Sequence, residues 1–336
     1  TVLVGGLNAG GRGFFALDIT DPTSPRPLWE ICATASLCPV VDGDIGLSFG
    51  NPVITKRSSD GRWVVLITSG YNNVSPGDGR GYLWVLDLAT GAVLSKVSTG
   101  VGSSTSPSGL ARIAGWARDP DADNTIQYVY GGDLQGNIWR FDLATSPPTV
   151  MRMATLMDAA GKVQPVTTRP ELGQIEGRRV VFVGTGRYLG QSDLQEPATL
   201  SPPGDWSYVG SLYAIKDGGS ALGNPRTSGT FVAQTLTTVA GGRRTASSNP
   251  VTWSTKDGWY IDFPSVGERI NIDPQLVLGT LVSTTNIPNS NACTAGGDSW
   301  IYQNNYQNGQ GVNTATGGEV GIFRSGTLTV GNAIVR

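Results

Sequence analysis

The 336-residue sequence contains no histidine at all. This absence excludes Ser-His-Asp and Cys-His catalysis, HExxH zinc sites and a histidine general base. A serine nucleophile would need a lysine instead, and the sequence has no S-x-x-K motif. No pattern nominates a pair of carboxylates for glycoside hydrolysis either. We therefore predict no catalytic residues and a protein that is not an enzyme.

Charge and long apolar runs are also scarce. Only 15% of the residues are charged, the net charge is -2, and the two signs are scattered. Without a basic stripe a nucleic-acid partner has no electrostatic support. No apolar run reaches the roughly 18 residues of a membrane-spanning helix, so no transmembrane segment is expected. The sequence has no signal peptide and begins inside a strand-like segment, TVLVGG, which we interpret as a fragment of a longer exported protein.

The sequence has only three cysteines, Cys32, Cys38 and Cys293. The first two bracket the short segment CATASLC, which a disulfide could close. We favour the disulfide because the chain has an exported character, and a reduced pair of buried thiols is the alternative. Cys293 is left over, and its partner would lie outside this fragment.

Glycine, proline and aromatic residues are abundant. The sequence has 47 Gly and 20 Pro, and no long stretch repeats apolar residues with helical spacing. This profile predicts an all-β fold with many tight turns. Disorder is the alternative for so much glycine and proline, but 9 Trp, 10 Tyr and 8 Phe argue against it.

Four segments share one template, in which a turn is followed by a strand with an aromatic residue at its fourth place. The aromatics recur every ~55–75 residues, which fits four-stranded propeller blades with long inserted loops. Glycine pairs before these turns would let neighbouring backbones approach closely. We predict a modified β-propeller of residues 1–336 as a single domain, with a β-sandwich carrying two long insertions as the alternative. The segments are Arg12–Asp18, Gly81–Asp87, Gly136–Asp142 and Gly210–Lys216, with Phe15, Trp84, Trp139 and Tyr213 at the fourth place.

One acidic stretch has carboxylates at every second position and can be compared with the EF-hand loop, whose oxygen ligands follow this spacing. Position 6 of that comparison is Asn124 instead of Gly, and position 12 is Tyr130, so the bidentate glutamate is missing. Oxygen ligands on a flexible loop favour Ca²⁺ over Mg²⁺ or Zn²⁺. The alternative is a solvated acidic turn. The predicted ligands are Asp119, Asp121, Asp123, the backbone carbonyl of Thr125 and the side chain of Gln127.

Two further acidic pairs occur, Asp42/Asp44 and Asp60/Asp78. We interpret both as surface turns and not as a second cation site. The loop Asn72–Arg80 (NNVSPGDGR) is Gly-rich but matches neither a P-loop nor a dinucleotide fingerprint, so we interpret it as a connection between strands.

In several segments the sequence resembles the C-terminal domain of the PilY/PilC family, the type IV pilus-associated proteins. Together these segments cover nearly the whole chain in the family's order. They are the run SFGNPVIT…GRWVVLITSGYNN…GRGYLWVLDLATG…ARDPDADN…YVYGGDLQGNIWRFDL, GGRGFFALDITDP at Gly10–Pro22, GTGRYLG at Gly184–Gly190, the matches within Gly258–Ile270, and CTAGGDSWIYQ at Cys293–Gln303.

The resemblance implies a modified β-propeller at the C-terminal end of a larger exported protein. It also implies a calcium site at Asp119, Asp121, Asp123 and the Thr125 carbonyl, where the family pattern ends in an aspartate and this sequence has Gln127. In the family, calcium occupancy is linked to whether the pilus extends or retracts. The implied setting is the cell surface, pilus tip or outer membrane. The implied partners are pilins or minor pilins, and a host surface receptor.

The sequence thus predicts a calcium-binding protein of type IV pilus (fimbrium) biogenesis, surface adhesion, twitching motility and virulence. Two other functions stay open at this point. A quinoprotein-dehydrogenase-like propeller enzyme would also carry Trp- and Gly-rich blades and calcium, but it usually has an adjacent cysteine pair that this sequence lacks. A glycan-binding propeller is the other.

Overall fold

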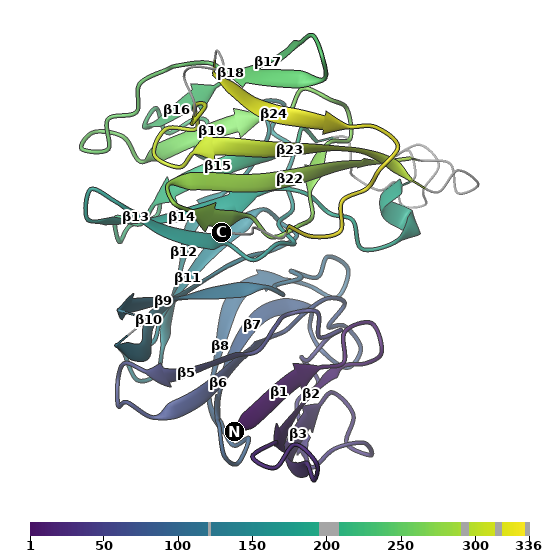
Figure 1. Cartoon of the computed structure of the whole chain (residues 1–336). Coiled ribbons are helices and arrows are strands. Elements are labelled where there is room, and N and C mark those ends of the chain that lie inside the picture. Colours follow the sequence, from purple (N-terminus) through teal and green to yellow (C-terminus); the bar gives the residue numbers. More distant parts are fainter. Residues whose placement is uncertain (120–121, 195–207, 290–295, 313–317, 333–336) are drawn as a thin grey trace. The chain divides into compact units, whose positions relative to one another are not determined.

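The computed structural model describes residues 1–119, 122–194, 208–289, 296–312 and 318–332, and the chain divides into two compact units. Unit 1 is Thr1–Met153 and unit 2 is Ala154–Arg336. Strands form nearly all of the regular structure (Figure 1), and the only helix among the described residues is a short 3-10 turn, η1 (Gln191–Leu194). None of the described residues form a helix long and apolar enough to cross a membrane. The all-β prediction is confirmed, while the single domain over residues 1–336 stays a prediction.

Unit 1 contains two sheets. The smaller has the order β1-β2-β3-β4, with β1 (Val2–Gly6), β2 (Gly13–Asp18), β3 (Arg26–Cys32) and β4 (Val40–Val41). The larger has the order β12-β11-β10-β5-β6-β7-β8, with β9 paired to β10. Its strands are β5 (Val53–Arg57), β6 (Trp63–Thr68), β7 (Arg80–Asp87), β8 (Val93–Gly102), β9 (Ile113–Asp119), β10 (Asp123–Gly132), β11 (Asn137–Asp142) and β12 (Thr149–Thr155), the last of which runs into unit 2.

Unit 2 also contains two sheets. One has the order β13-β14-β15-β19-β16, with β13 (Glu171–Ile175), β14 (Arg178–Gly184), β15 (Ser211–Lys216), β16 (Phe231–Gln234) and β19 (Gly258–Asp262). The other has the order β17-β18-β24-β23-β22-β20, with β21 paired to β22. Its strands are β17 (Leu236–Val239), β18 (Arg243–Ala246), β20 (Arg269–Ile270), β21 (Gln275–Val277), β22 (Thr280–Pro288), β23 (Gly297–Asn305) and β24 (Glu319–Arg324).

The larger sheet of unit 1 joins two runs of sequential strands, β5-β6-β7-β8 and β9-β10-β11-β12. The junction is a short parallel pairing of β5 with β10, in which Thr125 lies opposite Lys56 and Ile126 opposite Arg57. Each run is a four-stranded unit of the kind that forms a propeller blade. The short junction brings the start of β10, where the acidic stretch lies, beside β5.

The four repeated segments lie on β2, β7, β11 and β15, as the template predicts. Phe15 is half-buried, and its ring lies where a side chain on Gly5 would be. The other three aromatics are buried, and each donates a hydrogen bond to a polar side chain, which a buried indole or phenol requires. These bonds join Trp84 Nε1 to Asp42 Oδ2 (2.9 Å), Trp139 Nε1 to Asp133 Oδ2 (2.8 Å) and Tyr213 OH to Gln164 Oε1 (2.6 Å).

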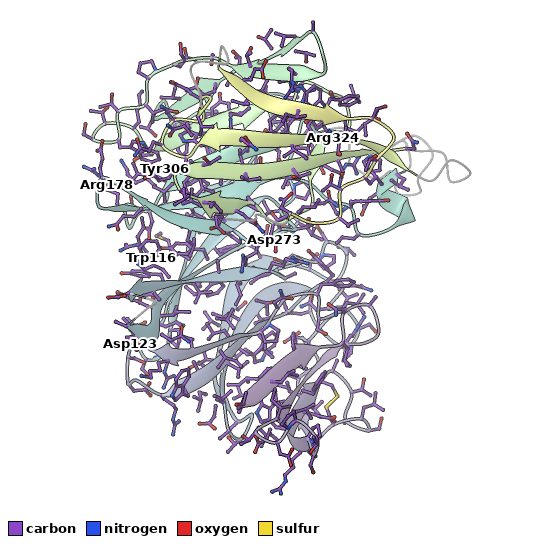
Figure 2. All side chains as sticks on the ribbon, viewed as in Figure 1. Trp116, Asp123, Arg178, Asp273, Tyr306 and Arg324 are labelled. Carbon is purple, nitrogen blue, oxygen red and sulfur yellow. A yellow bond between two sulfur atoms is a disulfide. The ribbon has the colours of Figure 1, made fainter. Side chains whose placement is uncertain are left out.

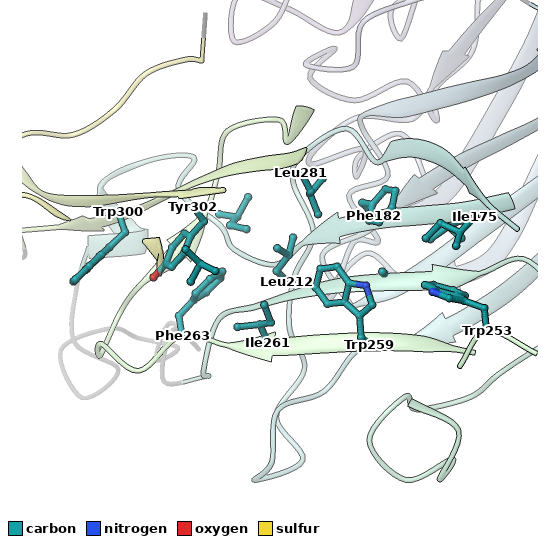
Figure 3. Close-up of a cluster of buried hydrophobic side chains, with 14 residues drawn as sticks. Ile175, Phe182, Leu212, Trp253, Trp259, Ile261, Phe263, Leu281, Trp300 and Tyr302 are labelled. Carbon is teal, nitrogen blue, oxygen red and sulfur yellow. The ribbon is translucent and has the colours of Figure 1, made fainter. Parts of the chain in front are cut away.

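Alternating apolar residues on the strands build the cores. Unit 1 has two buried clusters, one around Leu83 and Phe141 and one around Trp84 and Ile31. In unit 2 the two sheets share one cluster, because apolar side chains from β14, β15 and β19 meet others from β22 and β23. Figure 3 shows this cluster, with Trp259 among its members.

Glycine before the repeated turns permits close backbone approach, as the sequence predicts. Gly70 has φ +64, and a Cβ atom there would lie 2.1 Å from the backbone oxygen of Leu47. A Cβ atom on Gly186 would lie 2.5 Å from the backbone oxygen of Ile270. Both distances are too short for any other residue.

Cys32 and Cys38 form a disulfide bond, with their Cα atoms 6.0 Å apart. The preferred pairing is therefore confirmed, and the reduced alternative is wrong. Cys293 lies outside the described residues.

Candidate metal centre

The acidic stretch forms the outer end of the hairpin of β9 and β10. Asp119 ends β9, Asp123 begins β10, and the two residues are direct partners across the hairpin. Figure 2 shows Asp123 at this end. Thr125 and Gln127 belong to β10, so the connection is shorter than the EF-hand comparison suggests. Asp121 lies outside the described residues.

Irregular pairing shapes the start of β10. The register with β9 shifts between Asp123 and Ile126 and again between Ile126 and Tyr128, as in β-bulges. Ile126 is buried in the core of unit 1, and its Cδ1 atom lies where a side chain on Gly115 would be. The buried Ile126 thus anchors a hairpin end at which Asp119 and Ala122 to Asn124 are exposed.

Of the residues predicted to bind the ion, Asp119, Asp123 and Gln127 are exposed, and Thr125 is half-buried. Asp123 Oδ2 accepts a hydrogen bond from Thr125 Oγ1 (2.8 Å), and Asp119 Oδ1 accepts one from the backbone N–H of Ala122 (3.3 Å). The backbone carbonyl of Gln127 accepts a hydrogen bond from the Leu143 N–H (2.8 Å). The side-chain oxygen of Gln127, which is an exposed residue, is therefore the atom that would bind the ion in the predicted site.

Strand β5 holds the first residues of β10 in place. Thr55 Oγ1 donates to the backbone oxygen of Asn124 (2.6 Å), and Asn124 Nδ2 donates to the Ile54 oxygen (3.4 Å). The pairing of Lys56 with Thr125 continues this contact. The position of the hairpin end therefore depends on a strand that is distant in the sequence.

Sequence reasoning missed one charged neighbour of the site. Lys56 Nζ lies 3.5 Å from Asp123 Oδ1. The parallel pairing of β5 with β10 creates this ion pair, and no local pattern around Lys56 or Asp123 indicates it. A cationic side chain of the protein itself therefore lies beside one of the predicted ligands.

The donors of this hairpin end fit a hard cation. Two opposed carboxylates, a threonine and a glutamine provide oxygen and no nitrogen or sulfur ligand, which suits Ca²⁺ or Mg²⁺ and not Zn²⁺. Across the residues that the structure describes, no three His, Cys, Asp or Glu side chains group closely enough to hold a metal. Asp121, the third predicted carboxylate, is not among those residues.

The pair Asp42/Asp44 lies at a turn, as the sequence suggests, where the backbone N–H of Asp44 donates to Asp42 Oδ1 (3.0 Å), and both residues are half-buried. Lys96 Nζ lies 2.9 Å from Asp42 Oδ1 and 2.6 Å from Asp44 Oδ2, and it also lies over the rings of Tyr82 and Trp84. The pKa of Lys96 is raised, because the two carboxylates outweigh the partial burial that would lower it. A single lysine thus bridges this pair and offsets one of its two negative charges.

Asp60 and Asp78 do not form a pair. Asp60 is bound by Arg57, whose hydrogen bond holds the pKa of that carboxyl below its usual value, against a small opposing effect of burial. Asp78 Oδ2 accepts from the hydroxyl of Tyr82 (2.8 Å). The prediction that these residues form no joint cation site is consistent with these separate partners.

Asp133, in the turn between β10 and β11, was not singled out in the sequence. Its side chain is fully buried and accepts from Trp139 Nε1 (2.8 Å), Ser108 Oγ (3.2 Å) and the backbone N–H groups of Gln135 and Asn137 (both 2.9 Å). Burial raises the pKa of Asp133, although the bonds from Trp139 and Asn137 oppose this. The number of donors indicates a structural carboxylate that organises the turn.

Known proteins are similar to this chain over most of its length. A family described as "PilY1 beta-propeller domain" matches residues 1–240. The type IV pilus biogenesis factor PilY1 of Pseudomonas aeruginosa is 34% identical over 352 residues, covering 90% of this chain and 28% of the relative. A PilY1 homolog of Xylella fastidiosa is 30% identical over 335 residues, covering 90% of this chain and 21% of the relative. The chain thus spans about a quarter of the length of these relatives.

A solved structure agrees with these relatives. The crystal structure of the Pseudomonas aeruginosa PilY1 C-terminal domain matches with a TM-score of 0.77 and 27% identity, covering 97% of this chain and 75% of that one. This match, with the four-stranded units described above, confirms the β-propeller and makes the β-sandwich alternative wrong. The resemblance noted in the sequence is confirmed as well, and the chain belongs to the PilY1 β-propeller domain family.

Proposed function

We propose that this chain is a calcium-binding β-propeller that acts in type IV pilus biogenesis, without catalysing a reaction. The observation that supports the pilus role most strongly is its membership of a family whose curated relatives are named as pilus biogenesis factors. The proposed location is the bacterial cell surface, at the pilus tip or outer membrane. The proposed roles are pilus assembly, the balance of extension and retraction in twitching motility, and surface adhesion during infection.

The proposed calcium ligands are Asp119, Asp121, Asp123, the Thr125 carbonyl and Gln127. The observation that supports the ion site is the direct pairing of Asp119 with Asp123 at the hairpin end. Two carboxylates in this position repel each other, and a bound divalent cation would offset that repulsion. A site with glutamine where the family pattern has an aspartate has one negative charge fewer, so we expect a modest affinity that suits calcium-rich extracellular surroundings.

The mechanism we propose is that calcium fixes the outer end of the β9–β10 hairpin. Asp119 on β9 and Asp123 on β10 would hold the ion, which would supply a positive charge between their carboxylates. The chain's own residues then hold the hairpin to the blade, through buried Ile126 and through the bonds of Thr55 to Asn124. The surface offered to pilins, or to a host receptor, would depend on whether the ion is bound.

The test is a calcium titration by calorimetry of the wild type and of Asp123→Asn, which keeps the size of the side chain and removes its charge. We expect Asp123→Asn to lose at least tenfold in calcium affinity, which corresponds to about 1.4 kcal/mol. Glu30→Gln, at an exposed position of β3, is the matched control and should bind as the wild type does. Unchanged calcium binding by Asp123→Asn would contradict the assignment. In cells, the same variant should alter pilus retraction while Glu30→Gln should not.

A further inference from the structure

Lys56 is the feature of the hairpin end that the proposed calcium site leaves unexplained. Its ammonium group lies 3.5 Å from Asp123 Oδ1, so one of the expected calcium ligands already has a positive partner. The residues before and after it, Thr55 and Arg57, are buried, and the alternation along β5 therefore turns Lys56 toward solvent.

Side chains from four neighbouring strands form a row on this face of the sheet. Lys56 on β5 is the direct partner of Trp63 on β6 and of Thr125 on β10. Partners of this kind point to the same face. Thr125 Oγ1 in turn donates to Asp123, and Asp123 is the partner of Asp119 on β9. Lys56 thus lies between an aromatic ring and the two carboxylates.

The row gives the ammonium group two partners at once. Nζ lies 3.5 Å from the Asp123 carboxylate and, in the same position, 5.5 Å from the centroid of the Trp63 ring. The side chains of Lys56 and Asp123 are 38% and 55% exposed, so the ion pair is a weak one that can open. Lysine has a long flexible stem, which allows the ammonium group to move off the carboxylate while it stays over the ring.

We propose that Lys56 is an internal competitor for the calcium site: it neutralises Asp123 when no cation is bound, and it weakens calcium binding because its charge must leave that carboxylate. This inference rests on the proposed calcium site and adds a residue that sets its affinity. The residue comes from β5, outside the acidic stretch. Lys56 also links the site to the exposed Trp63, since its ammonium group contacts both the Asp123 carboxylate and the Trp63 ring.

The size of the effect follows from the charges. A divalent cation on Asp123 is repelled by an ammonium group a few ångströms away, and the repulsion is partly relieved when Lys56 swings toward Trp63. For exposed charges this leaves an expected effect of about 5- to 10-fold in calcium affinity. Because the charges are exposed, added salt should reduce the effect.

The experiment compares calcium affinities by calorimetry for the wild type, Lys56→Met, Lys56→Gln and Lys56→Arg. Methionine keeps the apolar stem without the charge, so Lys56→Met should bind calcium about 5- to 10-fold more tightly, and Lys56→Gln should agree with it. Lys56→Arg keeps the charge and should bind within about twofold of the wild type. Lys162→Met, at a half-buried position in unit 2, makes the same charge change and should also leave the affinity within about twofold.

Tryptophan fluorescence provides a second readout that does not depend on pilus activity. Calcium should change the emission of the wild type as the ammonium group moves relative to Trp63, and the change should be lost in Lys56→Met and in Trp63→Phe. Equal or weaker calcium binding by Lys56→Met and Lys56→Gln overturns the role of Lys56 and leaves the calcium site intact. No calcium binding by the wild type or by either variant overturns the calcium site and, with it, the role of Lys56.

Discussion

Replacement of Asp133 by asparagine tests how the blade of β9 to β12 is held together. The carboxylate is buried and accepts from five donors. Oδ2 accepts from Trp139 Nε1 and from Ser108 Oγ, while Oδ1 accepts from the backbone N–H groups of Gln135 and Asn137. The side-chain Nδ2 of Asn137 donates to both oxygens (3.2 and 3.1 Å). Of these five groups only the serine hydroxyl and the side-chain amide of Asn137 can turn to accept a hydrogen bond.

The structure fixes how the asparagine would have to sit. Its amide nitrogen can replace only Oδ2, because at Oδ1 it would face two backbone donors. At Oδ2 the Ser108 hydroxyl can rotate to accept, but Trp139 Nε1 then has no acceptor in a buried position. An orphaned buried donor costs about 1–3 kcal/mol, and the remaining bonds lose the contribution of the charge. We therefore expect Asp133→Asn to lower the free energy of unfolding by about 2–4 kcal/mol.

The assay is urea unfolding followed by circular dichroism, with Glu30→Gln as a control expected within about 0.5 kcal/mol of the wild type. Trp139→Phe removes the donor that Asp133→Asn orphans. The double variant should therefore be more stable than the sum of the two single effects predicts, by about 1 kcal/mol. If Asp133→Asn unfolds within about 0.5 kcal/mol of the wild type, the carboxyl is not the charged acceptor described above, and the reasoning fails.

Two further predictions concern local features of unit 1. Gly70→Ala should lower the free energy of unfolding by about 2 kcal/mol or more, because its Cβ atom would lie 2.1 Å from the Leu47 oxygen. Gly61 has a similar φ of +69 but open space around it, so Gly61→Ala should lower this free energy by only about 1 kcal/mol. Equal melting temperatures for the two variants would contradict the close approach. The hydrogen bond from Arg57 holds the pKa of Asp60 below its usual 3.8, so the stabilisation from this carboxylate is present above pH 3.8 and lost as the pH falls further. The stability difference between the wild type and Asp60→Asn should therefore shrink below pH 3.8, and a difference that grows on acidification would refute the sign.

Much of the fold could be predicted because it follows from local composition and repetition. The template with Trp84, Trp139 and Tyr213 located three strands correctly, since each aromatic must be buried and occupies the same place in its strand. Glycine at positions such as Gly70 could be interpreted from the turns it precedes. The polar partners of these aromatics could not be predicted, because each lies outside the template, in another strand or loop.

For the candidate site, the sequence by itself determined the oxygen donors, their spacing and the class of cation they suit. Only the tertiary structure decided that the stretch ends a hairpin, that Asp119 faces Asp123 across it, and that Lys56 forms an ion pair with one of the carboxylates. The physical reason is that pairing between β5 and β10 depends on how two blades meet, and no residue near the acidic stretch encodes that contact. The same reason explains Lys96, whose ammonium group bridges Asp42 and Asp44 from another strand. Ligand chemistry is local, but the charges that compete with a ligand come from the fold.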